Sequence, residues 1–288
     1  MTIKEIDERL EEGKSLKAIS QAFAEIANLK IKRIRSEVER NRLFFDEISK
    51  IYGIIKAFAL KKKVAISKPK KRLCILITSN YRFNGKLNTS LINYFVGSTR
   101  ELNDVDKIVL GRGAVDFFKA SKILPEYKEI LLKTDSPTPE ELIFLVKIMS
   151  EYNQVLIFHS KLKSLLVQRA TFTDITATSF YTQAFQVNPH DSKKANEFLN
   201  FIFEPELPRV LNFFENQILT LLLEETFLES ELSRTASRFI SMDQAETEAN
   251  KFIKESEKIK GYAIRSMENN KILENFASIV ATQKYGTS

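Results

Sequence analysis

All seven prolines of this 288-residue chain lie between Pro69 and Pro208. Proline removes a backbone donor and clashes with the preceding helical turn, so it interrupts a helix more strongly than any other residue. The two flanks are therefore free to form long helices, whereas turns divide the middle of the chain. We expect three parts, with bounds 1–68, 69–207 and 208–288.

The first flank carries apolar residues mainly at steps of three and four, which is the period of an amphipathic helix. The stripe consists of Ile3, Ile6, Leu10, Leu16, Ile19, Phe23, Ile26, Ile31, Ile34, Val38, Phe45, Ile48, Ile51, Ile55 and Phe58. Its weak point is Gly13, after which Ser15 is either the cap of a restarted helix or an ordinary surface residue. A continuous helix of this length would measure roughly 80 Å.

The last flank repeats the helical period from Leu211 to Val280, and Gly261 is its only glycine before the tail. Its helix would measure roughly 110 Å and would begin near Pro208, where proline is tolerated in a first turn. Two such stripes at opposite ends of a chain bury each other as an antiparallel coiled coil. The small residues between Ala236 and Ala249 would let the helices approach closely.

In the middle part the apolar residues no longer follow the helical period of the two flanks. Short apolar runs at 73–78, 107–110 and 155–159 predict buried strands, and segments 89–96, 115–120 and 139–152 predict helices. Residues 165–173 are expected to pair with the third strand as a hairpin across 160–164, and 188–194 to form a polar loop. Alternating strands and helices indicate an α/β sheet with an antiparallel edge. The predicted fold class is α/β: a Rossmann-like domain inserted between the two long helices of a coiled coil.

The loop from Ser79 to Lys86 lies where a phosphate-binding loop would be, between a strand and a helix, but it has no GxxxxGK[ST] or GxGxxG pattern. His159 and His190 are far apart in sequence, and no cysteine pair exists for a metal. Cys74, the single cysteine, excludes an intramolecular disulfide and is expected to be a buried small residue. We expect no cofactor, no metal site and no catalytic residues.

A net charge of +7 fits an acidic partner of some kind. The basic runs at 61–63 and 68–72 are not interleaved with aromatic residues, so nucleic acid is not an expected partner. No run approaches the roughly 20 apolar residues that span a bilayer. We interpret the basic runs as solvated helix faces and a junction.

Four segments resemble the gamma subunit of F-type rotary ATPases. They are SLKAISQAFAEIANLK from Ser15, CILITSNYRFNGKLNTSL from Cys74, the step Ile202-Phe203-Glu204-Pro205, and SRTASRFISMDQAETEA from Ser233. The last matches the family's C-terminal signature through Ala236, Arg238, Met242, Asp243 and Ala245. The resemblance covers essentially the whole chain, in order.

The resemblance implies a central rotor shaft, not itself an enzyme, whose helices stand inside a ring of ATPase subunits that perform ATP hydrolysis or synthesis. The implied partners are alpha-like and beta-like subunits in a hexamer with one copy of this chain, and epsilon-like and membrane-rotor or other load-bearing subunits. The implied location is cytoplasmic, peripheral at the cytoplasmic face of the membrane. The implied shaft and ring contacts are Ile19, Ala22, Lys30, Arg238, Met242, Asp243, Glu268, Asn269, Phe276, Ile279 and Val280, with Asn84, Gly85 and Asn88 in the domain loop.

The chain departs from the family pattern in three places. It is acidic from Glu5 to Glu12, where the family is basic, and Glu268 and Asn269 stand where the family has an Arg-Gln pair. The loop at 80–86 has one glycine where the family has three. These departures indicate a divergent member, either of ordinary ATP synthase or of a paralogous ATPase that drives another load, such as the motility machinery of mycoplasma-type bacteria. The alternative from another class is a non-rotary coiled-coil scaffold.

Overall fold

The computed structural model describes residues 2–61, 71–102, 104–124, 126–176 and 204–285. These fall into two compact units, one formed by 1–26 with 239–288 and the other by 27–238. Two helices run through both units: α1 spans Ile3–Lys61 and α7 spans Leu207–Tyr285. The bounds expected for the three parts stay a prediction, and the expected loop at 188–194, His190 and most of the basic runs lie outside the described residues.

In the helical unit, the start of α1 lies antiparallel to the later part of α7. Asp7 pairs with Lys260 at 2.6 Å, and the Gln21 amide donates to Glu246 at 2.7 Å. Residue numbers thus rise along one helix while they fall along the other. Helix α1 is continuous through Gly13, where an added Cβ would lie 2.9 Å from the Phe252 ring. The glycine therefore permits a close approach between helices and does not end one.

Helix α7 is longer than the partner segment of α1. Because Lys260 meets Asp7 near the beginning of α1, few residues of α1 remain to cover the turns of α7 that follow. Every side chain from Arg265 to Val280 is exposed. This end carries large apolar residues whose exposed fractions range from 45% to 66%: Met267, Ile272, Leu273, Phe276, Ile279 and Val280.

The second unit contains a five-stranded sheet of order β3-β2-β1-β4-β5. Its strands are β1 (Arg72–Ile77), β2 (Val105–Leu110), β3 (Lys128–Ile130), β4 (Gln154–Ser164) and β5 (Val167–Asp174). The first four are parallel, and β5 pairs antiparallel with β4. The helices between them are α2 (Leu87–Thr99), α3 (Arg112–Ser121) and α4 (Pro139–Met149). The α/β class with long terminal helices is confirmed.

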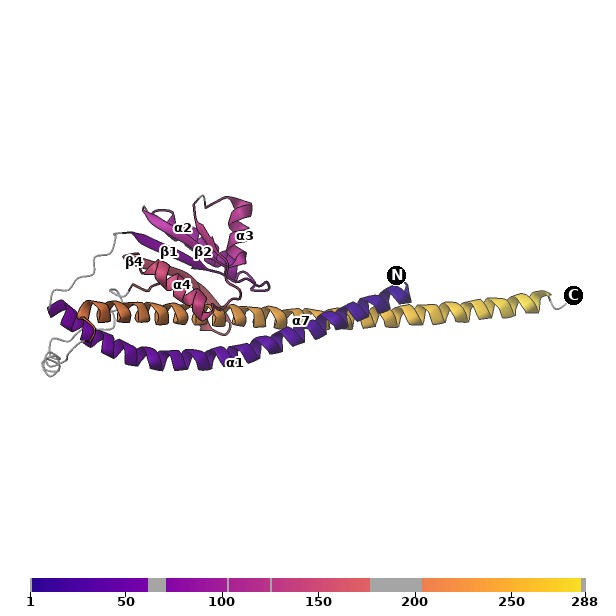
Figure 1. Ribbon diagram of the computed structural model, residues 1–288. Coiled ribbons are helices and arrows are strands. Elements are labelled where there is room, and N and C mark those ends of the chain that lie inside the picture. The colour runs from indigo at the N-terminus through magenta and orange to yellow at the C-terminus, as the bar shows by residue number, and fades with distance from the viewer. Residues whose placement is uncertain (1, 62–70, 103, 125, 177–203, 286–288) are drawn as a thin grey trace. The chain divides into compact units, whose positions relative to one another are not determined.

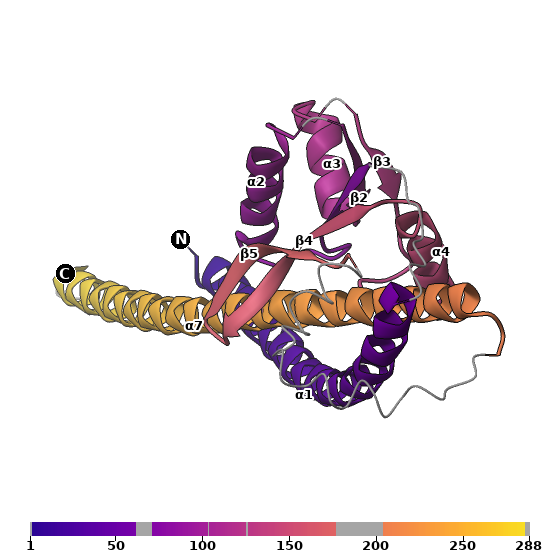
Figure 2. The same ribbon diagram turned by 90° about the vertical axis from the view of Figure 1, so that its left-hand side faces the viewer.

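Both faces of the sheet are covered, which explains why β1 is apolar without alternation. On one face Cys74 and Leu76 pack with Phe95 of α2 and Phe118 of α3. On the other face Leu73, Ile75 and Ile77 pack with α4 and with Leu219, Leu223 and Phe227 of α7. Figures 1 and 2 show α2 and α3 on one side of the sheet and α4 with α7 on the other. Helix α7 is thus part of the core of this unit.

The end of α1 packs against the start of α7 within the same unit. Tyr52 and Ile55 share a buried cluster with Leu211 and Ile218. Lys56 donates to the buried carboxylate of Glu215 at 3.0 Å. The expected antiparallel pairing of the two flanks is therefore present in this unit as well.

The strands and helices expected in the middle part are confirmed, with two differences. Strand β4 continues to Ser164, so the hairpin turns at Leu165 and Leu166 and not across 160–164. Strand β3 was not expected, because its three residues, Lys-Glu-Ile, are half-buried or exposed and carry little apolar signal. Among the described helices, none has the length and hydrophobicity of a membrane-spanning segment.

His159 lies inside the sheet and is 0% exposed. Its Nε2 is 2.9 Å from the Thr173 hydroxyl and its Nδ1 is 3.2 Å from the Ser160 carbonyl. Burial lowers the pKa of His159 to about 4 from the ordinary value of 6.5. The imidazole is therefore neutral in the folded chain at physiological pH, and its role is structural.

This pKa predicts a dependence of stability on pH. Below pH 6.5 the His159 imidazole is protonated in the unfolded chain, but in the folded chain it stays neutral down to about pH 4. The free energy of unfolding therefore falls as the pH is lowered through this window. The loss attributable to His159 is about 3 kcal/mol. Urea unfolding at pH 7.5 and 4.5, followed by near-ultraviolet circular dichroism, should show a smaller loss for His159→Gln than for the natural chain. Equal losses would contradict the assignment.

Candidate functional site at the carboxyl edge of the sheet

The N-terminus of α3 is closed by the chain's own loop. Ala114 N donates to the Thr78 hydroxyl at 3.2 Å, Gly113 N donates to the Ser79 carbonyl at 3.1 Å, and Arg112 N donates to Asn80 Oδ1 at 3.0 Å. These are the donors that a phosphate would use at a helix N-terminus. The edge of the sheet that commonly binds nucleotides is therefore occupied by hydrogen bonds within the chain itself.

Gly111 makes this closure possible. Its φ is +96°, and an added Cβ would lie 2.3 Å from the Thr78 carbonyl oxygen. A side chain would therefore push the end of β1 away from the start of α3. Gly111 thus lets two backbone segments touch.

Asp135 is the centre of the neighbouring loop and is only 5% exposed. Its carboxylate accepts hydrogen bonds from the Ser79 hydroxyl at 2.7 Å and from Asn80 N at 2.6 Å. The Asn80 amide donates in turn to the carbonyls of Leu132 and Thr134, at 3.1 and 3.2 Å. A carboxylate at position 80 would meet these carbonyls without a proton to donate.

Two arginines of α7 approach the same carboxylate. Arg234 Nε and Arg238 Nη2 each lie 3.9 Å from Asp135 Oδ2, and Arg234 Nη2 donates to the Asp135 carbonyl at 3.2 Å. The Arg234 side chain is 2% exposed, and this burial lowers its pKa while Asp135 and Glu231 oppose the shift. Within the described residues, Arg234 Nε and Nη1 have no hydrogen-bond partner. The buried guanidinium therefore depends on nearby carboxylates for compensation.

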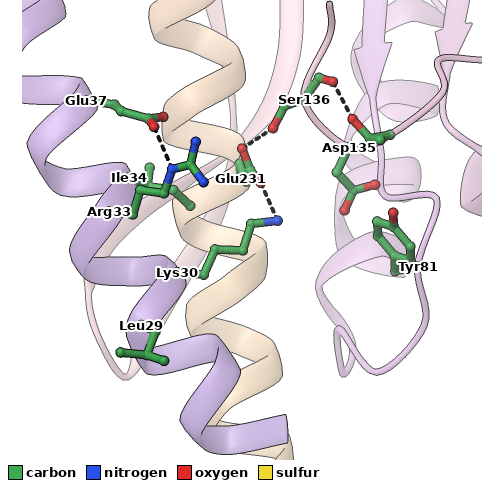
Figure 3. A pocket seen from close by; sticks show the side chains of 10 residues that line it. Leu29, Lys30, Arg33, Ile34, Glu37, Tyr81, Asp135, Ser136 and Glu231 are labelled. Carbon is green, nitrogen blue, oxygen red and sulfur yellow. Dashed lines mark hydrogen bonds and ion pairs between the residues drawn. The ribbon is translucent and has the colours of Figure 1, made fainter.

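Glu231 joins three segments of this unit. Its carboxylate accepts from Lys30 of α1 at 2.5 Å and from the hydroxyl of Ser136, beside Asp135. Figure 3 shows Lys30 and Ser136 reaching Glu231 from opposite sides. A hollow of about 570 Å³ lies between them. Its lining is Leu29, Lys30, Arg33, Ile34, Glu37, Tyr81, Thr134, Asp135, Ser136 and Glu231.

Arg238 also holds the loop that follows β1. Its Nη2 donates to Asn84 Oδ1 at 3.2 Å, and its guanidinium lies 5.7 Å from the centre of the Tyr81 ring. The adjacent Ser237 hydroxyl donates to the Asn84 carbonyl at 2.9 Å. Together with Asp135 and Glu231, these contacts tie one face of α7 to two loops of the sheet. We call Ser79, Asn80, Asp135, Ser136, Glu231, Arg234 and Arg238 the junction cluster.

Only some of the residues in and around the junction cluster were among the site residues expected from the sequence. Arg238 and Asn84 are in contact, Lys30 reaches Glu231, and Asn88 lies beside Gly113, where an added Cβ would be 3.0 Å from its amide nitrogen. Gly85 follows in the same loop with φ +54°. Asp135, Ser79, Glu231 and Arg234 were missed. Arg234 precedes Arg238 by one helical turn, which was the one signal that the sequence offered, whereas the strand before Asp135 was itself not expected.

The remaining expected residues lie in the helical unit. Met242 is buried, whereas Ile19, Ala22 and Asp243 are exposed. Glu268, Asn269, Phe276, Ile279 and Val280 are exposed on the uncovered end of α7. The contacts of these residues with other subunits stay a prediction.

Removal of the Asp135 charge should destabilise the second unit. Asp135→Asn keeps the shape of the side chain but leaves the buried Arg234 without its carboxylate at 3.9 Å, which is expected to cost about 3–5 kcal/mol of unfolding free energy. The matched control is Glu129→Gln, which breaks an exposed pair with Lys119 and should cost no more than about 1 kcal/mol. Urea unfolding of both variants measures the difference. Similar losses for the two would show that the cluster does not carry the stability assigned to it.

The sequence was compared with those of known proteins. The model of the ATP synthase family matches residues 2–259. The ATP synthase gamma chain of Stenotrophomonas maltophilia (strain K279a) is 21% identical over 264 residues, covering 87% of this chain and 88% of its own. The gamma chain of Ruthia magnifica is 22% identical over 267 residues, with coverages of 88% and 89%.

Solved structures share the fold. A chain in the central stalk and c-ring structure of Tetrahymena thermophila mitochondrial ATP synthase aligns with a TM-score of 0.60 at 19% identity, covering 79% of this chain and 99% of that one. A chain in the Euglena gracilis mitochondrial enzyme aligns with a TM-score of 0.54 at 13% identity, with coverages of 91% and 97%. Since the family match spans far more than half of the sequence, the chain belongs to the ATP synthase family, as a divergent relative of its gamma chains.

Proposed function

We propose that this chain is the rotor shaft of an F-type ATPase and turns as a unit inside a ring of ATPase subunits. Its membership of the family of gamma chains, which are the non-catalytic stalk of ATP synthase, supports this function. The single observation that carries the proposal is the uncovered end of α7, a helix with exposed large apolar residues on a chain of that family. Such residues favour burial against a partner.

We infer that ATP is hydrolysed or synthesised in the partners. The similar solved chains come from ATP synthase assemblies that contain F1, the central stalk and the c-ring. By analogy, the partners of this chain are alpha-like and beta-like ring subunits, with one copy of the chain per hexamer. An epsilon-like subunit and a membrane rotor or other load would complete the assembly at the cytoplasmic face of the membrane.

We infer that the two units have different mechanical roles. The helical unit would lie within the ring, where Phe276, Ile279 and Val280 enter an apolar bearing and Glu268 and Asn269 meet polar ring residues. Ile19, Ala22 and Asp243 would face the ring on the same helices, whereas Met242 is buried within the helical unit and would support them from inside. Each conformation of the ring favours one orientation of an asymmetric shaft, so the ATPase cycle shifts the population from one orientation to the next.

The second unit would pass this motion to the load. If α7 rotated without the α/β domain, its rotation would not reach the load, so the two have to move together. The junction cluster supplies this connection, because Arg234, Arg238 and Glu231 of α7 hold loops on both sides of β2. Lys30 adds α1 to the same set of contacts. In this proposal, torque in the paired helices reaches the sheet through buried ionic contacts.

Truncation after Gly261 tests the placement of α7. The variant keeps the Lys260–Asp7 pair and the whole second unit but loses every exposed apolar residue of the uncovered end. We expect the chain to fold, to bind the ring more weakly, and to couple ATP turnover poorly to its load. Co-purification of tagged chain with ring subunits, together with ATPase activity, measures both effects.

A chain that ends after Tyr285 is the matched control, since it retains all of α7 and should behave as the natural chain. Full occupancy of the ring and normal coupling in the Gly261 variant would exclude the proposed bearing. Equal amounts of this chain and of a partner without ATPase activity would instead support a scaffold.

A further inference from the structure

The β4–β5 hairpin extends beyond the rest of the sheet. Pairing of β1 with β4 ends at Phe158, but β4 continues to Ser164 and pairs with β5 up to Val167. The outer part is therefore a two-stranded arm with an irregular register between Leu162 and Ser164. Its turn is held by Gln168, whose amide donates to the Leu165 carbonyl at 2.7 Å. A two-stranded hairpin is only marginally stable alone, so an arm of this kind needs further support.

Helix α7 provides the support and sets the direction of the arm. Lys161 pairs with Glu229 at 3.1 Å, and the Ser160 hydroxyl lies 3.4 Å from the Ser230 carbonyl. The beginning of β4, at Val155, shares its buried cluster with Leu219 and Leu223. Residue numbers therefore rise together along β4 and α7, and the tip points the way that α7 runs toward Arg238.

The tip combines apolar residues with positive charge. Leu165, Leu166 and Val167 are 38%, 77% and 41% exposed, and Lys163 and Arg169 are exposed beside them. The sequence has no acidic residue between Glu151 and Asp174. Adjacent apolar residues on a projecting arm mark a contact surface. The basic flank selects a partner with negative charge, because complementary potentials guide and orient association.

We propose that the tip of this hairpin, Lys163 to Arg169, docks on an acidic surface of a ring subunit. The inference rests on the proposed function, since it requires the helix that continues past Arg238 to enter the ring. The direction of the arm brings its tip to that side of the second unit. The α/β domain then contacts the ring through its own basic, apolar-tipped arm as well as through the shaft helices.

A single cysteine at the tip tests the contact in the assembled complex. The only natural cysteine, Cys74, is buried, and burial raises the pKa of its thiol to about 11, so it stays unreactive. Leu166→Cys should form a cross-link to a ring subunit with a short thiol-to-amine reagent. Ile143→Cys, on α4 and 69% exposed, is the matched control and should not.

A third cysteine separates the two proposals. Met267→Cys, on the uncovered end of α7, should cross-link to the ring if the shaft is placed correctly. A cross-link from position 267 but none from position 166, or one from 166 to a lipid or to a subunit outside the ring, would overturn the hairpin contact alone. Failure at position 267 would overturn the rotor placement itself.

Charge reversal tests the chemistry of the partner. Lys163→Glu with Arg169→Glu should lower the cross-linking yield from position 166 by about tenfold at low salt. Lys147→Glu, an exposed lysine of α4, should leave that yield unchanged. Added salt should lower the cross-linking yield of the Leu166→Cys chain with Lys163 and Arg169 intact toward the yield of the charge-reversed variant. An unchanged yield in the double variant would show that the partner surface is not acidic.

Discussion

The buried carboxylate of Asp135 is the interaction on which the second unit most depends. It receives two hydrogen bonds from the loop after β1 and faces two arginines of α7. Burying a guanidinium costs several kcal/mol unless a charge compensates it, so the position of α7 and the position of the loops are linked. A shaft helix that passed the sheet through apolar contacts alone would have less orientational specificity than one held by ionic contacts.

The same contacts fill the edge of the sheet at which many α/β proteins bind a nucleotide. Thr78, Ser79 and Asn80 use the first free amides of α3, and Gly111 allows the two segments to touch. The edge that serves ligand binding in many α/β proteins here serves attachment to a helix.

Much of this fold was predictable from the sequence because period and proline placement act locally. The buried strands around Cys74, Val109 and Ile157 read as apolar runs, and the flanks read as helices. The junction cluster was less predictable because its members are scattered polar residues whose meeting depends on tertiary packing. Arg234 looks like a surface arginine in sequence, and only the presence of Asp135 opposite makes its burial tolerable. The turn at Leu165 was displaced because polar residues of β4 in the overhanging arm read as a loop.

Rotation is the central claim, and a single-molecule measurement tests it most directly. A bead attached through a cysteine at the exposed position 143 would report the motion of the α/β domain in surface-fixed complexes. We expect ATP to make the bead turn continuously in one direction, and the motion to stop when ATP is removed. Steady ATP consumption by a complete complex while the bead shows only random fluctuation would contradict it.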